Sequence, residues 1–121
     1  IHDGARPCIT SKILENSIIH ASINGSAVAA VPVKDTIKIA DESLTVSTTL
    51  DRKHLWSVQT PQVFATKTLR HAHETIIEDV TDDASMMEAL GAKVSLFQSE
   101  YSNIKVTTKE DIHLVEVLMS N

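Results

Sequence analysis

Apolar residues in the first third of the chain follow two different spacings. Over 11–24 they recur at helical spacing and predict a core-facing helix, which Thr10 caps and Gly25 ends. Residues 27–33 then form a continuous apolar run, which is typical of a strand buried on both faces, and Pro32 marks the end of its pairing. The pattern therefore predicts the helix and a buried strand of a βαβ unit.

A polar segment over 35–52 interrupts this pattern. Residues 36–39 and 45–50 are rich in β-branched side chains and alternate, and a polar turn at 41–43 joins them, which predicts a β-hairpin arm. Because an isolated hairpin is only marginally stable, we expect the arm to pack against another part of the protein.

The second half of the chain predicts short elements. Residues 55–64 contain Pro61, which argues against a regular helix or central strand, so we expect a structured loop there. Further helices are expected over 66–78, 82–90 and 109–119, with a strand over 94–97 and an extended segment over 103–106. Their predicted N-caps are Thr66, Thr81 and Thr107, the last forming a capping box with Glu110. Helices that alternate with apolar strands indicate an α/β sandwich.

The first seven residues join the end of a predicted strand to a polar loop. Pro7 keeps the preceding backbone out of the helical region and holds Asp3 beside Gly4. Ligands of open α/β sheets gather beyond the carboxyl ends of strands, so Asp3 is placed to meet a ligand, although a role in the turn explains it equally well. Since no initiator Met precedes this strand end, we expect the C-terminal part of a longer enzyme.

Composition narrows the function classes. The chain has 121 residues, of which 42% are hydrophobic and 22% charged, so it is long enough for one domain and predicts neither disorder nor a membrane span. A net charge of −5 argues against nucleic-acid and anionic-membrane partners. The one cysteine, Cys8, can form no internal disulfide, which fits a reducing cytoplasm.

Individual residues taken alone identify no site. Lys105 is a possible phosphate ligand, but its position between two apolar residues favours a solvated edge lysine. Arg52 ends the predicted hairpin and suits two-pronged phosphate recognition, whereas a lone exposed arginine usually serves solubility. The six histidines lack metal-ligand spacing, and there is no glycine-rich dinucleotide motif, Walker loop or serine elbow.

Five polar motifs nevertheless stand in one order along the whole chain. They are HDGARP at 2–7, PVKDTIK at 32–38, Arg52 with LW at 55–56 and QTPQ at 59–62, TDDAS at 81–85, and NIKVT at 103–107. Together they resemble the 2-C-methyl-D-erythritol 4-phosphate cytidylyltransferase family. The resemblance implies that 1–121 is the C-terminal part of a single cytidylyltransferase domain, with a Rossmann-like nucleotide-diphospho-sugar transferase fold (a three-layer sandwich) and a protruding β-hairpin dimerisation arm at about 35–52.

The activity implied by the resemblance is the transfer of CMP from CTP to 2-C-methyl-D-erythritol 4-phosphate, with release of pyrophosphate, in non-mevalonate isoprenoid biosynthesis. It also implies a homodimer, Mg²⁺ bound with CTP, and a location in the bacterial cytoplasm or the plastid stroma. The family's N-terminal glycine-rich loop, with its transition-state-stabilising Arg and Lys, is absent from this chain. We therefore expect it to be inactive without an N-terminal half.

Two catalytic residues are implied by the resemblance. Arg52, reaching across from the partner subunit, and Lys105 match the pair that positions the acceptor phosphate, and Lys105 also lies near the CTP phosphates. Cations suit this reaction because they align two mutually repelling anions. No acid or base is required, since a phosphate monoester is already ionised near neutral pH.

Five substrate-binding residues are implied in the same way. Asp3 and Gly4 match the loop between CTP and the acceptor, where many family members carry Ala in place of Gly4. Thr60 and Thr81 match residues that hold the acceptor, and Thr36 matches a group that reaches it from the partner's arm.

Two alternatives stay open. Ribitol-5-phosphate cytidylyltransferase shares the Thr-Pro-Gln and Asn-Ile-Lys-Val motifs, although Leu55-Trp56 and the segment 32–36 favour the first family. A non-catalytic dimerisation or binding module would instead be a folded dimer without affinity for CTP.

Overall fold

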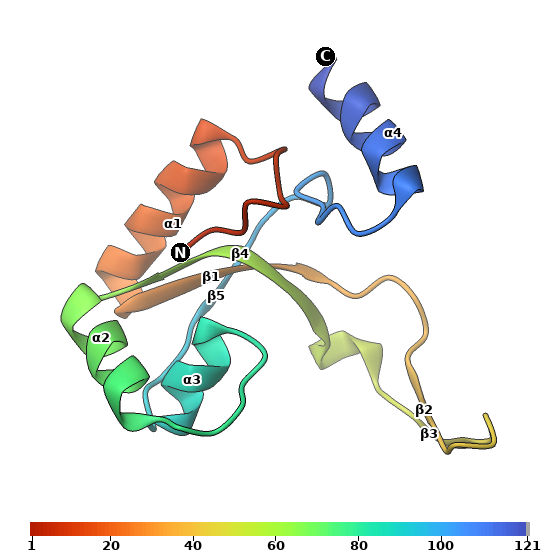
Figure 1. Ribbon diagram of the computed structural model, residues 1–121, viewed down its shortest axis with the longest axis horizontal. Coiled ribbons are helices and arrows are strands. Elements are labelled where there is room, and N and C mark those ends of the chain that lie inside the picture. Colours follow the sequence, from red (N-terminus) through yellow and green to blue (C-terminus); the bar gives the residue numbers. More distant parts are fainter. Residues whose placement is uncertain (121) are drawn as a thin grey trace.

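The computed structural model describes residues 1–120, which surround a three-stranded mixed sheet (Figure 1). The central strand β1 (Ser26–Pro32) pairs antiparallel with β4 (Trp56–Phe64) and parallel with β5 (Leu96–Gln98). Because helices cover both faces of the sheet, the apolar run of β1 is buried, as predicted. The predicted α/β class is therefore confirmed, and the sheet is observed to be mixed.

Helix α1 (Ser11–Asn24) covers one face of the sheet and forms as its sequence predicts. Thr10 Oγ1 accepts a hydrogen bond from the Ile13 N–H at 3.2 Å, and Gly25 ends the helix in the left-handed region with φ 85°. Ile13 belongs to the same buried cluster as Phe97 of β5. This cluster joins the first helix to the last strand of the sheet.

The opposite face carries α2 (Thr66–Thr75) and α3 (Asp83–Ala89), whose N-caps differ from the predictions. Thr66 is the first helical residue and Ala65 holds the cap position without a side-chain hydrogen bond. The cap of α3 is Asp82, not Thr81, because its Oδ1 accepts from the Ser85 N–H at 2.7 Å. Helix α2 also ends three residues before the predicted limit of 78.

Strand β4 corrects the expectation of a structured loop over 55–64. The register of its pairing shifts between Val28 and Ala30, where residues 59–61 of β4 stand opposite one residue of β1. The proline of β4 lies in this bulge, where the strand pairing does not require the N–H that proline lacks. The interruption was predicted correctly and the type of element was wrong.

The C-terminal helix α4 (Lys109–Met119) lies away from the sheet (Figure 1). Its N-cap is Thr108 rather than Thr107, and the capping box forms with Asp111 rather than Glu110. In the described part of the chain, the expected extended segment at 103–106 pairs with no strand, but the Val106 N–H donates to Ala5 O at 2.8 Å. Within residues 1–120, no helix has the length and apolarity needed to cross a membrane.

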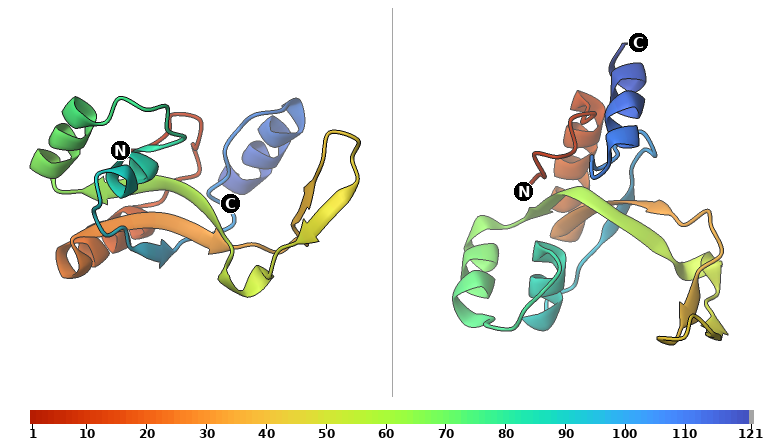
Figure 2. Two further views of the ribbon diagram at one scale, coloured as in Figure 1. Left: turned by 90° about the horizontal axis from the view of Figure 1, so that it is seen from below. Right: turned by 45° about the vertical axis from the view of Figure 1, so that its right-hand side comes forward.

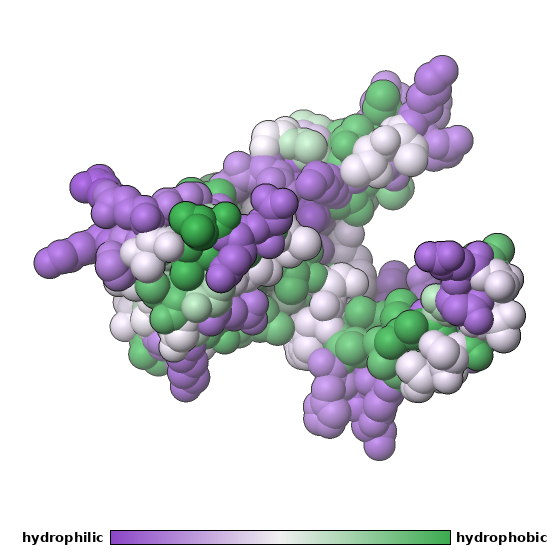
Figure 3. Space-filling model, turned by 60° about the horizontal axis from the view of Figure 1, so that its bottom comes forward, coloured by the Kyte–Doolittle hydropathy of each residue, from purple (hydrophilic) through white to green (hydrophobic). Residues whose placement is uncertain are grey.

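The predicted hairpin over 35–52 is present as β2 (Lys38–Ala40) and β3 (Val46–Thr49), paired antiparallel. It projects from the sheet in every view (Figures 1 and 2), and all residues of both strands are exposed. Apolar side chains gather on its surface (Figure 3). This chain alone therefore provides no core for the arm.

Candidate active site

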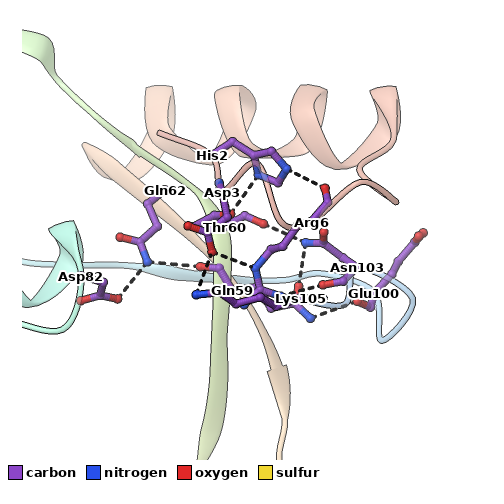
Figure 4. A network of polar contacts seen from close by, with 10 residues as sticks. All are labelled: His2, Asp3, Arg6, Gln59, Thr60, Gln62, Asp82, Glu100, Asn103 and Lys105. Atoms are coloured by element: carbon purple, nitrogen blue, oxygen red, sulfur yellow. Dashed lines mark hydrogen bonds and ion pairs between the residues drawn. The ribbon is translucent and has the colours of Figure 1, made fainter. Parts of the chain in front are cut away.

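Three segments that are distant in sequence meet beside β4 and form the candidate site (Figure 4). They are the N-terminal loop at 1–7, the bulge of β4 at 59–62, and the segment 99–106 that follows the carboxyl end of β5. The loop is attached at its start, because the Ile1 N–H donates to Gln62 O at 3.0 Å and the Gln62 N–H donates to Ile1 O at 2.9 Å. The polar motifs at both ends of the chain thus lie together.

Thr60 fixes the backbone of the N-terminal loop. Its Oγ1 accepts a hydrogen bond from the Asp3 N–H at 2.9 Å and lies 2.9 Å from His2 Nδ1. The second ring nitrogen, Nε2, lies 3.0 Å from Arg6 O. A consistent assignment has the Thr60 hydroxyl donating to Nδ1 and the Nε2–H donating to the carbonyl. One lone pair of Thr60 Oγ1 remains for another donor.

The Asp3 carboxylate lies between two cations. Arg6 Nε donates to Asp3 Oδ2 at 3.3 Å, and Lys105 Nζ lies 3.8 Å from the same oxygen. The Arg6 side chain is 11% exposed and that of Lys105 is 51% exposed. Two positive charges against one negative charge leave a net positive charge at the surface of the site, which favours a phosphate ligand.

A buried layer of amides lies beneath these charges. Asn103, which is completely buried, donates through Nδ2 to Gln59 Oε1 at 3.0 Å and to Thr60 O at 2.8 Å. Gln59 Nε2 donates to Glu100 O at 3.1 Å, and Arg6 Nη1 donates to Asn103 O at 2.8 Å. The three segments of the site are therefore joined by side-chain hydrogen bonds.

The amide layer continues to α3 through Gln62. Its Nε2 donates to Asp82 Oδ2 at 2.9 Å, and its Oε1 accepts from the Ala84 N–H at 2.9 Å. Burial raises the pKa of Asp82, but hydrogen bonds from Ser85 and Gln62 outweigh it, so this pKa lies below its usual value. Asp82 is thus held as a carboxylate that caps the helix and anchors the amide layer.

The structure brings together three of the seven sequence-predicted site residues, namely Asp3, Thr60 and Lys105. Gly4 lies in the same loop, and a Cβ added there would meet nothing within 4 Å, so the alanine expected from the family fits. Thr81 is exposed, with its hydroxyl 3.1 Å from Ser85 Oγ.

The other two predicted residues, Thr36 and Arg52, flank the two strands of the arm in sequence and are exposed. Arg52 Nη1 donates to Lys34 O and so ties the two ends of the arm together. Within residues 1–120, no hydrogen bond or ion pair joins either residue to Asp3 or Lys105.

Sequence reasoning gave no role to His2, Arg6, Gln59, Gln62 or Asn103. Each lies inside one of the five motifs, but its function in the site depends on long-range hydrogen bonds. The available signal was the number of polar residues packed into segments that adjoin apolar strands.

The side chains of the site offer few ligands for a metal ion. Among residues 1–120 no group of three or more His, Cys, Asp or Glu side chains is placed to hold one. The carboxylate of the site, Asp3, already faces Arg6 and Lys105. These side chains therefore do not fit a complete Mg²⁺ site.

Comparison with solved structures gives a close match. The structure of the 2-C-methyl-D-erythritol 4-phosphate cytidylyltransferase from Thermus thermophilus superposes with a TM-score of 0.89 and 32% sequence identity, over 99% of this chain and 60% of that one. The fold is therefore that of part of a cytidylyltransferase structure.

Sequence comparisons specify the family. The model described as "IspD: 2-C-methyl-D-erythritol 4-phosphate cytidylyltransferase" matches residues 1–121. The protein of that name from Alkaliphilus oremlandii is 48% identical over 122 residues, which cover 98% of this chain and 52% of that protein. The chloroplastic protein from Oryza sativa subsp. japonica is 47% identical over 127 residues, covering 99% of this chain and 41% of that protein.

This chain belongs to the 2-C-methyl-D-erythritol 4-phosphate cytidylyltransferase family, as its motifs predicted. It spans about half the length of the curated relatives it matches.

Proposed function

We propose that this chain is the C-terminal part of a cytidylyltransferase domain that transfers CMP from CTP to 2-C-methyl-D-erythritol 4-phosphate. The products are 4-diphosphocytidyl-2-C-methyl-D-erythritol and pyrophosphate, in the non-mevalonate isoprenoid pathway. The observation that carries the proposal is the family match over 1–121, which includes the motifs that supply Asp3, Thr60 and Lys105. The proposed complete fold is the Rossmann-like nucleotide-diphospho-sugar transferase sandwich.

In the proposed reaction an oxygen of the acceptor phosphate attacks the α-phosphorus of CTP. The new P–O bond forms as the bond to pyrophosphate breaks, and pyrophosphate leaves with its electron pair. We propose that Lys105 holds the acceptor phosphate against the repulsion of CTP, because it is the more exposed cation beside Asp3. Arg6, nearly buried, stays on Asp3 and on Asn103 O.

The remaining roles are proposed from family position together with geometry. The free lone pair of Thr60 Oγ1 accepts a hydrogen bond from a hydroxyl group of the methylerythritol phosphate. Asp3 and Gly4 line the space between the two substrates. Arg52 and Thr36 contact the acceptor across a dimer, since both lie on the exposed arm. Thr81, exposed at the start of α3, completes the acceptor site.

Mg²⁺ is proposed to arrive with CTP, and when bound it would supply positive charge to the phosphates. Because the described side chains do not form its site, no step is assigned to it. A homodimer is proposed through the arm. The cell compartment is proposed to be the bacterial cytoplasm or the plastid stroma, since a chloroplastic relative matches as well as the bacterial ones do.

A chimeric protein tests this function. Residues 1–121 replace the matching part of the Alkaliphilus oremlandii relative, so that the relative supplies the length this chain does not span. We expect pyrophosphate release from CTP with 2-C-methyl-D-erythritol 4-phosphate, and none from the 121-residue chain alone.

Two acceptors and one binding measurement separate the alternatives. A higher kcat/KM with D-ribitol 5-phosphate than with the methylerythritol phosphate would assign the chain to the ribitol enzyme. A folded, dimeric chimera that neither binds CTP nor turns it over would indicate a non-catalytic module.

A further inference from the structure

We propose that Asn103 is the positioning residue that sets Lys105 and Asp3 relative to each other. Only the kinetic part of this inference rests on the proposed function, and the structural part is independent of it. No charge or reactive group is attributed to Asn103, and it acts through its neighbours.

Asn103 connects all three segments of the site (Figure 4). Its Nδ2 donates to Gln59 Oε1 and to Thr60 O in the bulge of β4, at 3.0 and 2.8 Å. Its own carbonyl accepts from Arg6 Nη1 of the N-terminal loop at 2.8 Å. Its N–H donates to Glu100 O at 3.1 Å within the third segment.

The chemistry of this side chain is specific. Both hydrogens of Nδ2 are used, whereas Oδ1 is buried and has no partner among residues 1–120. An amide at this position therefore leaves one buried acceptor unpaired, which is unfavourable. An aspartate would place a carboxylate against two oxygen acceptors, and an apolar residue would leave Gln59 Oε1 and Thr60 O without this donor. The nitrogen is the group that the position requires.

Lys105 depends on this anchor. Its Nζ lies 3.8 Å from Asp3 Oδ2, which exceeds hydrogen-bond length, and a half-exposed ion pair of this kind is weak. The backbone on either side holds it instead, through the Asn103 amide before it and the Val106 N–H to Ala5 O after it. Without the side-chain amide, the segment before Lys105 loses its bonds to the bulge of β4 and keeps only the backbone bonds of Asn103 to Arg6 and Glu100.

Amide hydrogen exchange in the chimera, read at residues that this chain supplies, tests the structural part. The Asp3 N–H and Val106 N–H report on the site, and the Val28 N–H, which donates to Ser95 O in the core, is the internal reference. We expect Asn103→Ala to lower protection at both reporters by about tenfold or more, with no change at Val28, because local opening is separate from global unfolding.

Gln62→Ala is the matched control, since it also truncates a buried side-chain amide but makes no side-chain bond to 103–106. In this control the exchange protection of both reporter N–H groups is expected to stay within about threefold of that in the parent protein. Unchanged protection in Asn103→Ala, or equal losses in both variants, would overturn the proposal. Should the alanine variant fail to fold, Asn103→Ser keeps one donor and is read against the same two reporters.

A double-mutant cycle in the chimera tests the kinetic part. A misplacement of about 1 Å costs on the order of 100-fold in rate, so Asn103→Ala should lower kcat by about 10- to 100-fold. On a Lys105→Ala background the same substitution should lower it less than about threefold further, whereas Gln62→Ala should have its full effect on both backgrounds. Full multiplicative effects of Asn103→Ala would show that it does not act through Lys105. An inactive parent chimera would overturn the proposed function, and the exchange experiment would still decide this inference.

Discussion

At the scale of single residues, the charge balance around Asp3 determines what the site is able to bind. Arg6 is nearly buried and is shared between Asp3 and Asn103 O, so its charge is largely committed within the protein. Lys105 is half exposed, and its contact with the same carboxylate is long, at 3.8 Å. It is therefore the cation that a phosphate can recruit with little rearrangement.

The first prediction concerns the two proposed catalytic cations, Lys105 and Arg52, in the chimera. Lys105→Ala and Arg52→Ala should each lower kcat/KM by about 100-fold or more while the fold is retained, because groups that align phosphates act on the transition state. Arg52→Lys should also be impaired, since the planar fork is lost. Lys109→Ala is the charge-matched control for Lys105→Ala, and Lys53→Ala is the control for Arg52→Ala. We expect near-normal rates from both controls. A near-normal rate in either test variant would remove that residue from the site.

Asp82 gives a prediction about stability and pH in the 121-residue chain. The pKa of Asp82 is lowered in the folded state. The ionised carboxylate therefore contributes fully to the free energy of unfolding above the unfolded-state pKa of about 3.9, and this contribution is lost as the pH falls through the folded-state pKa. Asp82→Ala should cost about 1 kcal/mol at pH 7 through the lost cap of α3. The difference from the parent chain should shrink below about pH 4. Urea denaturation at a series of pH values measures it.

Glu88→Ala, at an exposed acidic position on the same helix, is the control for Asp82. The free energy of unfolding of this control should stay within about 0.5 kcal/mol of that of the parent chain at every pH, as is usual for surface substitutions. A penalty for Asp82→Ala that does not change between pH 7 and pH 3 would mean that charge is not what the cap contributes.

At the scale of elements, local signals predicted α1 well and the second half of the chain less well. Thr10 and Gly25 bracket α1 because N-cap and left-handed C-cap requirements are local. Strand β4 was missed because a bulge opposite Ala29 accommodates its proline, and that depends on the partner strand. The same limit applies to the site, where Asp3 could be proposed from its loop but Asn103 could not.

The two threonines at helix starts give a matched test of capping. Thr10→Ala should destabilise the 121-residue chain by about 1 kcal/mol, because the hydrogen bond to the Ile13 N–H is lost. Thr66→Ala should be nearly neutral, because Thr66 lies inside α2 and makes no cap bond. Thermal or urea denaturation of both variants measures the difference. Equal losses would mean that Thr66 does contribute to the start of α2.

At the scale of the whole molecule, the exposed arm is the feature that a single chain does not explain. Ile39 and Val46 are each 50% exposed, and Leu44 at the tip is 86% exposed with φ 62°, a left-handed conformation that is unfavourable for leucine. The composition of 35–52 predicted this hairpin and its lack of a core. Patches of exposed apolar side chains commonly mark interaction surfaces, which is consistent with the proposed dimer.

The proposed dimer links association to catalysis in the chimera. Shortening the arm across 38–48 should shift the protein toward monomer in sedimentation, because the element exchanged between subunits is lost. If Thr36 and Arg52 complete the neighbouring subunit's site, the shortened protein should lose affinity for the methylerythritol phosphate while it still binds CTP. A shortened protein that remains dimeric and binds both substrates would contradict the exchanged arm.

Mixed dimers decide which subunit Arg52 serves. A heterodimer of an Arg52→Ala chimera with an Asp3→Ala chimera contains one site with neither substitution and one with both, if the arm crosses between subunits. Two-fold symmetry then predicts about half of the parent activity per heterodimer, whereas each homodimer is nearly inactive. If Arg52 instead serves its own subunit, every site in the heterodimer carries one substitution. Purified heterodimers with differently tagged subunits would then show no recovery, and the crossed arm would be excluded.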